Sequence, residues 1–269
     1  MKAEDTLRKM AAERPLVHHL TNYVTVNLVA NATLCAGALP VMAHAAEEVE
    51  EMVAHASALA INMGTLDPPW IEAMLKAGRE ANRRGIPIVL DPVGVGATSF
   101  RTEMAAKLLS EVEFSAVCGN AGEIATIAGL EAEVRGVESL GGDARTAVRE
   151  AAKSLGATVA ATGPTDFVSD GERIFAVENG HPLMGKIVGS GCASTAIIAC
   201  FAAAANDASL ETVSEALAFF GRAGEDAAEG PEVGGPGTFE GHLLDAVAAL
   251  AAEPRLLEGR LRTSEVESG

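Results

Sequence analysis

The segment Ile86-Pro87-Ile88-Val89-Leu90-Asp91 decides the fold class of this chain. It is continuously apolar and ends in an acidic residue, which is typical of a strand buried on both faces of a parallel sheet. Shorter apolar runs at residues 115–118 and 158–161 repeat this form. We therefore predict a parallel sheet built from strands of this kind.

Further apolar runs alternate with helix-like patterns on the N-terminal side of this segment. The alternation predicts helices packed on both faces of the sheet. Two prolines at the start of one helical pattern agree with this reading, because proline is tolerated in the first turn of a helix. Strands are expected over residues 15–20, 38–42 and 58–62, and helices over residues 22–34, 47–54 and 68–84.

The alternation changes on the C-terminal side. Residues 167–174 hold an Asp170-Gly171 pair between two β-like runs, which predicts a hairpin and an antiparallel edge of the sheet. The polar tail from Glu258 is expected to fray. Beyond Gly191 we expect only helices, over residues 192–205, 208–229 and 239–252.

Composition and charge narrow the possible partners. Of 269 residues, 48% are hydrophobic and 21% charged, as in globular proteins, and the absence of a repeat or linker predicts one α/β domain over residues 1–269. The net charge of −17 argues against a nucleic-acid partner, because it repels phosphate backbones. No basic amphipathic stretch offers a membrane contact. Six of the 20 basic residues are Lys, which fits either a salt-rich cytoplasm or an ordinary acidic cytosolic protein.

The expected location is the cytoplasm. The N-terminal residues lack the basic and apolar regions of a signal peptide, and the apolar run 193–205 is too short to span a bilayer. The four cysteines form no CxxC pair and have no metal-ligand spacing, so buried thiols in a reducing compartment are expected.

The loop Gly189-Ser190-Gly191-Cys192 leads directly into an apolar helix. Backbone N–H groups at a glycine-rich helix start form an anion site, which suits the charge of a transferring phosphoryl group. The pKa of Cys192 is expected to fall at such a helix start. The alternative is a tightly packed helix start with a buried cysteine.

Asp91 opens the second candidate site, because it ends a buried strand before the loop Pro92-Val93-Gly94-Val95-Gly96. Ligands bind at this edge of α/β sheets, and a carboxylate there suits Mg²⁺. A dinucleotide loop is the rival interpretation, but the third glycine is missing and Asp-Pro separates the loop from its strand. A simple turn after the strand is also possible.

Five further segments have candidate roles. Asn120 and Glu123 match a capping box, while Glu123 is also placed to order metal-bound water. Thr162 precedes Gly163 and either offers a hydroxyl to a nucleotide phosphate or forms a turn. Polar strand ends beside methionine suit a small heteroaromatic ring, although a lone Met42 is more often core; these ends are His18-His19-Leu20-Thr21-Asn22, Pro40-Val41-Met42 and Asn62-Met63-Gly64-Thr65.

In this order, the segments resemble the hydroxyethylthiazole kinase family of the ribokinase-like superfamily. The resemblance spans residues 15 to about 245 and includes Pro236-Gly237-Thr238-Phe239. Cys192 is its most specific feature, since related kinases usually carry Asp there as a general base. The resemblance implies a single-domain ribokinase-like fold, mostly parallel, with a small antiparallel edge.

The resemblance also implies ATP-dependent phosphorylation of the primary alcohol of 4-methyl-5-(2-hydroxyethyl)thiazole, a salvage step in thiamine biosynthesis. It implies Mg²⁺ and a homotrimer with thiazole sites at subunit interfaces. Carried over by position, Cys192 lies beside the substrate hydroxyl. Met42 and Gly189 would contact the thiazole, with Asn22 and Gly64 as neighbours. Thr162 and position 118 would contact ATP. Asp91 and Glu123 would bind magnesium.

One position departs from the family pattern. Cys118 stands where the family usually has Arg or Lys reaching ATP, which weakens a phosphate contact by about 1–3 kcal/mol if that contact is charge-assisted. Lys186 is a candidate to compensate. Two rival interpretations are a hydroxymethylpyrimidine kinase and an NAD(P)H-hydrate repair lyase, both of which normally have Asp at position 192. Two others are a nucleotide-binding regulatory module without catalysis and an NAD-dependent oxidoreductase.

Overall fold

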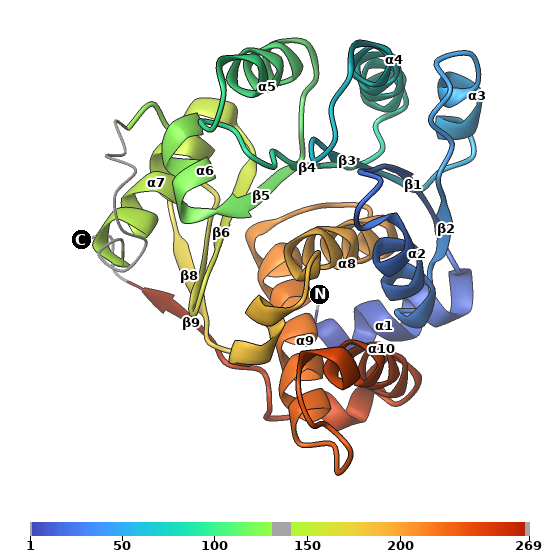
Figure 1. Ribbon diagram of the computed structural model, residues 1–269, viewed down its shortest axis with the longest axis vertical. Coiled ribbons are helices and arrows are strands. Elements are labelled where there is room, and N and C mark those ends of the chain that lie inside the picture. The colour runs from blue at the N-terminus through green and yellow to red at the C-terminus, as the bar shows by residue number, and fades with distance from the viewer. Residues whose placement is uncertain (1, 131–140, 267–269) are drawn as a thin grey trace.

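The computed structural model describes residues 2–130 and 141–266 of the chain (Figure 1). Their strands form one sheet in the order β2-β1-β3-β4-β5-β6-β7-β8-β9. Strands β2 to β6 of this order pair in parallel, and β7, β8 and β9 pair antiparallel. The predicted α/β class with an antiparallel edge is confirmed. The strands are β1 (Leu16–Leu20), β2 (Leu39–Val41), β3 (Ala58–Asn62), β4 (Ile88–Asp91), β5 (Ala116–Asn120), β6 (Thr158–Thr162), β7 (Asp166–Ser169), β8 (Ile174–Val177) and β9 (Thr263–Val266).

Helices cover both faces of the sheet, and each face has its own apolar core (Figure 1). Two short 3₁₀ helices, η2 (Pro182–Lys186) and η3 (Pro254–Leu257), lie on the face of the first group. The first group of helices is α1 (Ala3–Glu13), α2 (Val26–Cys35), α8 (Ser190–Ala205), α9 (Leu210–Ala228) and α10 (Pro236–Ala252), and the second is α3 (Val49–Val53), α4 (Pro68–Arg84), α5 (Ser99–Glu111), α6 (Ala121–Ile127) and α7 (Gly141–Leu155).

Helix α4 shows how closely local signals can fix an element. The Asp67 side chain accepts a hydrogen bond from the Trp70 N–H, prolines occupy the first turn, and Gly85 ends the helix with φ 68°. These are the expected start and stop signals of a helix. The predicted bounds, 68–84, match the observed ones.

Helix α8 is buried from Ala193 to Ala204, as predicted for the apolar run 193–205. It lies between the sheet and the other helices of its face, with α2 and α9 packed against it. A helix that is apolar all round has no face suited to water. Its position fixes its N-terminus, residues 190–192, at the carboxyl edge of the parallel strands.

Helix α2 begins at Val26 and not at residue 22 as predicted. The Asn22 Oδ1 atom accepts hydrogen bonds from the N–H groups of Val24 and Thr25, at 3.0 Å each. An asparagine that bonds its own following backbone favours a turn over a helix. Residues 22–25 therefore form a turn that delays the helix.

The prediction of a frayed tail, with only helices beyond Gly191, is wrong. Residues 263–266 form β9, which pairs antiparallel with β8 in the register Ile174↔Val266 to Val177↔Thr263. The strand is mostly exposed and polar, so its sequence lacks the apolar alternation that identifies strands. Backbone pairing with β8 holds it.

Among the described residues, no helix combines the length and the apolar composition that a membrane span needs.

Glu215 on α9 is expected to make the stability of the protein depend on pH. Among the described residues its buried Oε2 has no hydrogen-bond partner, and burial, with Glu4 and Glu211 nearby, raises its pKa from 4.5 to about 7. As pH rises from 4.5 to 7 the unfolded chain loses this proton and the folded chain keeps it, so stability falls. We expect Glu215→Gln to be more stable than wild type by about 1–2 kcal/mol at pH 8 and nearly equal at pH 4.5.

Urea unfolding at both pH values measures this difference. Glu211→Gln is the matched control, because the bond to Arg173 lowers the pKa of Glu211 and its loss should destabilise the protein at pH 8. A Glu215→Gln variant less stable than wild type at pH 8 would contradict the expectation.

Candidate active site

Three polar side chains gather at the carboxyl edge of β1, β3 and β4. Asn62 ends β3 and Asp91 ends β4, and the two residues are paired in the sheet register. Alternate residues of a strand share a face, and Ala60 and Val89, two positions earlier, belong to the core beneath α8. Asn62 and Asp91 therefore face the N-terminus of α8, and Asn22 joins them from the turn after β1.

A chain of hydrogen bonds links these side chains to Cys192. Asn22 Nδ2 donates to Asn62 Oδ1 at 2.8 Å, and Asn62 Nδ2 donates to Asp91 Oδ2 at 2.6 Å. Asn62 Nδ2 also lies 3.2 Å from Cys192 Sγ, and Asn22 Nδ2 lies 3.6 Å from it. Asn22, Asn62 and Asp91 are all buried. The structure thus brings together residues that the sequence predicted separately, and Asn62, quoted only within its segment, is their centre.

Gly64 and Gly189 hold this group through close packing. The Gly64 N–H donates to Asn62 Oδ1 at 2.9 Å, and a Cβ at Gly64 would lie 2.6 Å from Asn22 Cβ. Gly189 has φ 95°, and a Cβ there would lie 2.6 Å from Thr25 Cγ2. Both positions require glycine because another backbone or side chain approaches closely.

Arg101 is a residue that sequence reasoning missed. It lies in the first turn of α5, which Thr98 caps. Its guanidinium donates to the carbonyl oxygens of Met63 (2.7 Å), Gly64 (2.6 Å) and Val93 (2.7 Å). It therefore ties the loop after β3 to the loop after β4. Nothing in the local sequence distinguishes it from a surface arginine, because its partners are main-chain atoms of distant segments.

The electrostatics of the site leave both the carboxyl and the thiol less acidic than usual. Burial first, and then the charge of Glu123, raise the pKa of Asp91 to about 7. Burial, followed by the charge of Asp91, also raises the pKa of the Cys192 thiol. The expected fall of this thiol pKa at the helix start is therefore wrong, because desolvation and a neighbouring carboxylate outweigh the helix end. Burial and the nearby carboxylate both favour the neutral thiol of Cys192.

Glu123 forms the predicted capping box and also reaches the loop after β4. The Asn120 N–H donates to Glu123 Oε2 at 2.8 Å, and the Glu123 N–H donates to Asn120 Oδ1 at 3.0 Å. The other oxygen, Oε1, accepts from the Gly94 N–H at 2.7 Å. A carboxylate has about four lone-pair sites, so these bonds leave acceptor capacity beside the Asp91 loop. The Asp91 and Glu123 carboxylates offer oxygen ligands of the kind that Mg²⁺ prefers.

A cavity of about 520 Å³ lies beside the start of α8. Thr162 at the end of β6 and Gly191 and Ser194 of α8 line it, together with Leu217 and Phe220 of α9 and residues 179–182, 184 and 185. The Thr162 hydroxyl donates to the Gly119 carbonyl at 3.2 Å, which turns it toward the end of β5. A cavity of this volume, lined by both apolar and polar residues, suits a small-molecule ligand.

Thr162 lines this cavity, and the other predicted contact residues, among them Cys118 and Met42, do not. Cys118 is 2% exposed and belongs to the core beneath α8, where burial and the charge of Asp91 raise its pKa. Met42 is half-buried directly after β2, at the same edge of the sheet. It stands on the far side of β1 from Asn62, since β1 lies between β2 and β3.

Comparison with known proteins identifies the family of this chain. Residues 7–253 match the Hydroxyethylthiazole kinase family. A protein of Rubrobacter xylanophilus named hydroxyethylthiazole kinase is 66% identical over 269 residues, 100% of both chains. A solved structure of hydroxyethylthiazole kinase protein from Pyrococcus horikoshii OT3 is 42% identical with a TM-score of 0.89, over 98% of this chain and 99% of that one.

A more distant solved structure shares only the fold. A ribokinase-like superfamily protein from Enterococcus faecalis V583 is 15% identical with a TM-score of 0.62, over 91% of this chain and 94% of that chain. The full-length match at 66% identity and the family match over residues 7–253 carry the assignment. The chain belongs to the hydroxyethylthiazole kinase family.

Proposed function

We propose that this chain transfers the γ-phosphoryl group of ATP to the primary alcohol of 4-methyl-5-(2-hydroxyethyl)thiazole, giving ADP and the phosphate ester. This is a salvage step in thiamine biosynthesis. The observation that carries the proposal is the bonded group Asn22, Asn62, Asp91 and Cys192 beside the start of α8 and the 520 Å³ cavity. The proposal takes the chain as one domain acting in the cytoplasm, and its four free thiols suit a reducing compartment.

In the proposed mechanism, Asn22 and Cys192 orient the substrate alcohol, with Met42, Gly64 and Gly189 shaping the thiazole site. The cavity lined by Thr162 accepts the nucleotide. Main-chain N–H groups at the start of α8 stabilise charge on the phosphoryl oxygens. The transition state of phosphoryl transfer is loose, so positioning and electrostatics supply most of the rate.

Asp91 and Glu123 would hold Mg²⁺. The metal, when bound, neutralises charge on the phosphate oxygens during transfer. Each carboxylate is already oriented by hydrogen bonds, Asp91 by Asn62 and Glu123 by Gly94 and Asn120. Oriented oxygen ligands lower the cost of arranging the metal site.

Cys192 is expected to contribute modestly, through its position. A neutral thiol with a raised pKa accepts an alcohol proton poorly, so Cys192→Ala should lower kcat by about 10- to 100-fold, and Cys192→Asp should remain active. Steady-state kinetics with purified variants measures both. Cys200→Ala is the control, because Cys200 is a buried thiol of the same helix and its loss should affect stability alone. A loss beyond about 10⁴-fold for Cys192→Ala, or a folded but inactive Cys192→Asp, would contradict this role.

A homotrimer with the thiazole site at subunit interfaces is the proposed assembly. Tyr23, Val24 and Val188 are 66%, 69% and 73% exposed, and they flank Asn22 and Gly189 of the site. Exposed apolar side chains grouped at one place are typical of interaction surfaces. Light scattering should give the mass of a trimer, and Val188→Glu should reduce it. The control Leu256→Glu, at another exposed apolar residue, should keep the trimer, and a monomeric wild type would refute the assembly.

An assay of ADP release separates this function from its rivals. The protein is incubated with ATP, Mg²⁺ and one of three alcohols: hydroxyethylthiazole, hydroxymethylpyrimidine or pyridoxal. We expect turnover with hydroxyethylthiazole to exceed the others by at least about 100-fold. Equal turnover of the pyrimidine would favour the rival kinase. Tight ATP binding without turnover would favour a regulatory module, for which Cys118 at the family's basic position is the motivation.

A further inference from the structure

The segment from Asn179 to Met184 forms one wall of the 520 Å³ cavity. It begins just after β8 and ends within η2, and its first residues are irregular main chain. Helix α9 approaches this segment so closely that a Cβ at Gly221 would overlap the Asn179 carbonyl, and one at Gly224 would overlap the Met184 sulfur. The backbone of α9 therefore packs directly against this wall.

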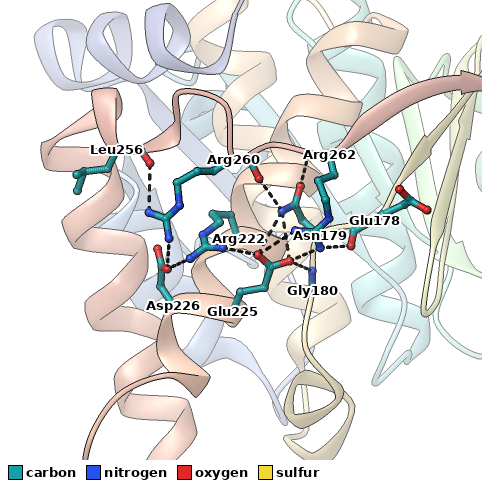
Figure 2. A network of polar contacts seen from close by, with 9 residues as sticks. All are labelled: Glu178, Asn179, Gly180, Arg222, Glu225, Asp226, Leu256, Arg260 and Arg262. Atoms are coloured by element: carbon teal, nitrogen blue, oxygen red, sulfur yellow. Dashed lines mark hydrogen bonds and ion pairs between the residues drawn. The ribbon is translucent and has the colours of Figure 1, made fainter.

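Glu225 follows these two glycines on α9 and bonds the wall directly (Figure 2). Its Oε1 accepts from the Gly180 N–H at 2.9 Å and from Asn179 Nδ2 at 3.3 Å. Two arginines complete its shell, Arg262 Nη2 at 2.5 Å and Arg222 Nη1 at 2.7 Å. The Glu225 side chain is only 12% exposed, so solvent competes little for these bonds.

The opposite side of the wall is bonded by the segment that leads into β9 (Figure 2). The Arg262 N–H donates to Asn179 Oδ1 at 2.6 Å, and Asn179 Nδ2 donates to the Arg260 carbonyl at 3.1 Å. Arg262 Nη2 also donates to the Glu178 carbonyl at 2.5 Å. Asn179 is 5% exposed, and both its amide oxygen and nitrogen are used. Two segments distant in sequence thus hold Asn179 and Gly180 in one position.

Asp226, the next residue of α9, belongs to the same network and does not touch the wall. It bonds Arg222 and, at 2.5 Å, Arg260 Nη2. Its side chain is 25% exposed, twice the value for Glu225. The network therefore contains one carboxylate that contacts the cavity wall and one that contacts only arginines.

Charge explains why the wall-facing partner is a carboxylate. Burial alone would raise the pKa of Glu225, but Arg262, the Gly180 N–H and Arg222 together hold it below its usual value. An ionised acceptor bonds main-chain N–H groups about twice as strongly as a neutral one. The Gly180 amide, which has no helix or strand to bond with, gains its acceptor in this way.

We propose that Glu225 is a positioning residue for nucleotide binding: it fixes the main chain of Asn179 and Gly180 so that the cavity wall matches the ATP base and ribose. Arg262 is its counter-ion and second support. This inference rests on the proposed assignment of the cavity to ATP. Asn22 and Cys192, which the proposed function assigns to the thiazole, do not line this cavity.

The test compares Glu225→Gln with Asp226→Asn, two isosteric losses of one charge in the same network. For Glu225→Gln we expect the KM for ATP to rise by about tenfold, with the KM for hydroxyethylthiazole and kcat within about threefold of wild type. For Asp226→Asn we expect both KM values within about twofold of wild type. Thermal unfolding of both variants records their stabilities. A loss of structure that affects both substrate sites would raise the KM for ATP and the KM for hydroxyethylthiazole together.

Three results would overturn the proposal: an unchanged ATP KM in Glu225→Gln, an equal rise in Asp226→Asn, or a parallel rise of both KM values. If Glu225→Gln does not fold, Arg262→Gln is tested instead, because this variant keeps the bond between Glu225 and Gly180. A rise of about threefold in its KM for ATP would support the proposal, and no rise would overturn it. Calorimetric titration with ADP gives a readout without turnover. If the wild-type protein phosphorylates none of the three alcohols but Glu225→Gln binds ADP more weakly than wild type, this inference stands and the proposed function is rejected.

Discussion

Asp91→Asn is expected to lower kcat by about three orders of magnitude or more. The substitution preserves the shape of the side chain and removes the charge that would hold Mg²⁺ beside Glu123. Loss of one preorganised electrostatic contact commonly costs 10² to 10³ in rate, and in the proposed site Asp91 would bind the metal in addition to accepting the hydrogen bond from Asn62. The half-saturating Mg²⁺ concentration should rise as well.

The measurement is kcat against Mg²⁺ concentration at saturating ATP and hydroxyethylthiazole. Asp67→Asn is the control, because Asp67 is an N-cap carboxylate of α4 outside the proposed site, and Asn caps helices equally well. Asp67→Asn should behave as wild type. A folded Asp91→Asn variant within about tenfold of wild-type kcat would exclude Asp91 from the reaction.

Gly189→Ala is expected to damage both stability and thiazole use. With φ 95° and a Cβ 2.6 Å from Thr25 Cγ2, the alanine suffers backbone strain and overlap, which together cost about 2–4 kcal/mol of unfolding free energy. Relief requires α8 to move away from the turn that holds Asn22. A displacement of about 1 Å at reacting groups can lower the rate by 10², so kcat/KM for hydroxyethylthiazole should fall by about 100-fold or more.

Urea unfolding and steady-state kinetics test these two effects. Gly191→Ala is the control for stability, because no atom lies within 4 Å of a Cβ there, and its unfolding free energy should stay within about 0.5 kcal/mol of wild type. Thr25→Ser removes the overlapping methyl group and should restore part of the stability of Gly189→Ala. Equal stability of the Gly189 and Gly191 variants would contradict the packing described for Gly189.

The local part of the fold was predictable from sequence. Continuously apolar runs identified the parallel strands, and two prolines in the first turn identified the start of α4. Where a side chain competed with the backbone, as Asn22 does before α2, the predicted boundary failed. Strand β9 was missed because backbone pairing with β8, and not an apolar pattern, holds it.

The candidate site was predictable only as separate pieces. Asp91 ends one strand and Asn22 closely follows another, positions that sequence can identify, and topology then brings them together. Arg101 and Glu225 were missed because their partners are main-chain groups of distant segments. The pKa of Cys192 was predicted in the wrong direction because helix position is visible in sequence, while burial and the nearness of Asp91 are not.

The two outer strands of the sheet bear on how copies of this chain can associate. Strand β2 has three residues, and its central residue, Pro40, has no N–H to offer. Strand β9 at the other edge is short and polar, with Glu265 in its middle. Short strands, proline and charge all discourage a further strand from adding to a sheet. Continuous sheets across subunits, and the fibrous aggregation that follows from them, are therefore disfavoured at both edges, which leaves side-chain packing as the means of assembly.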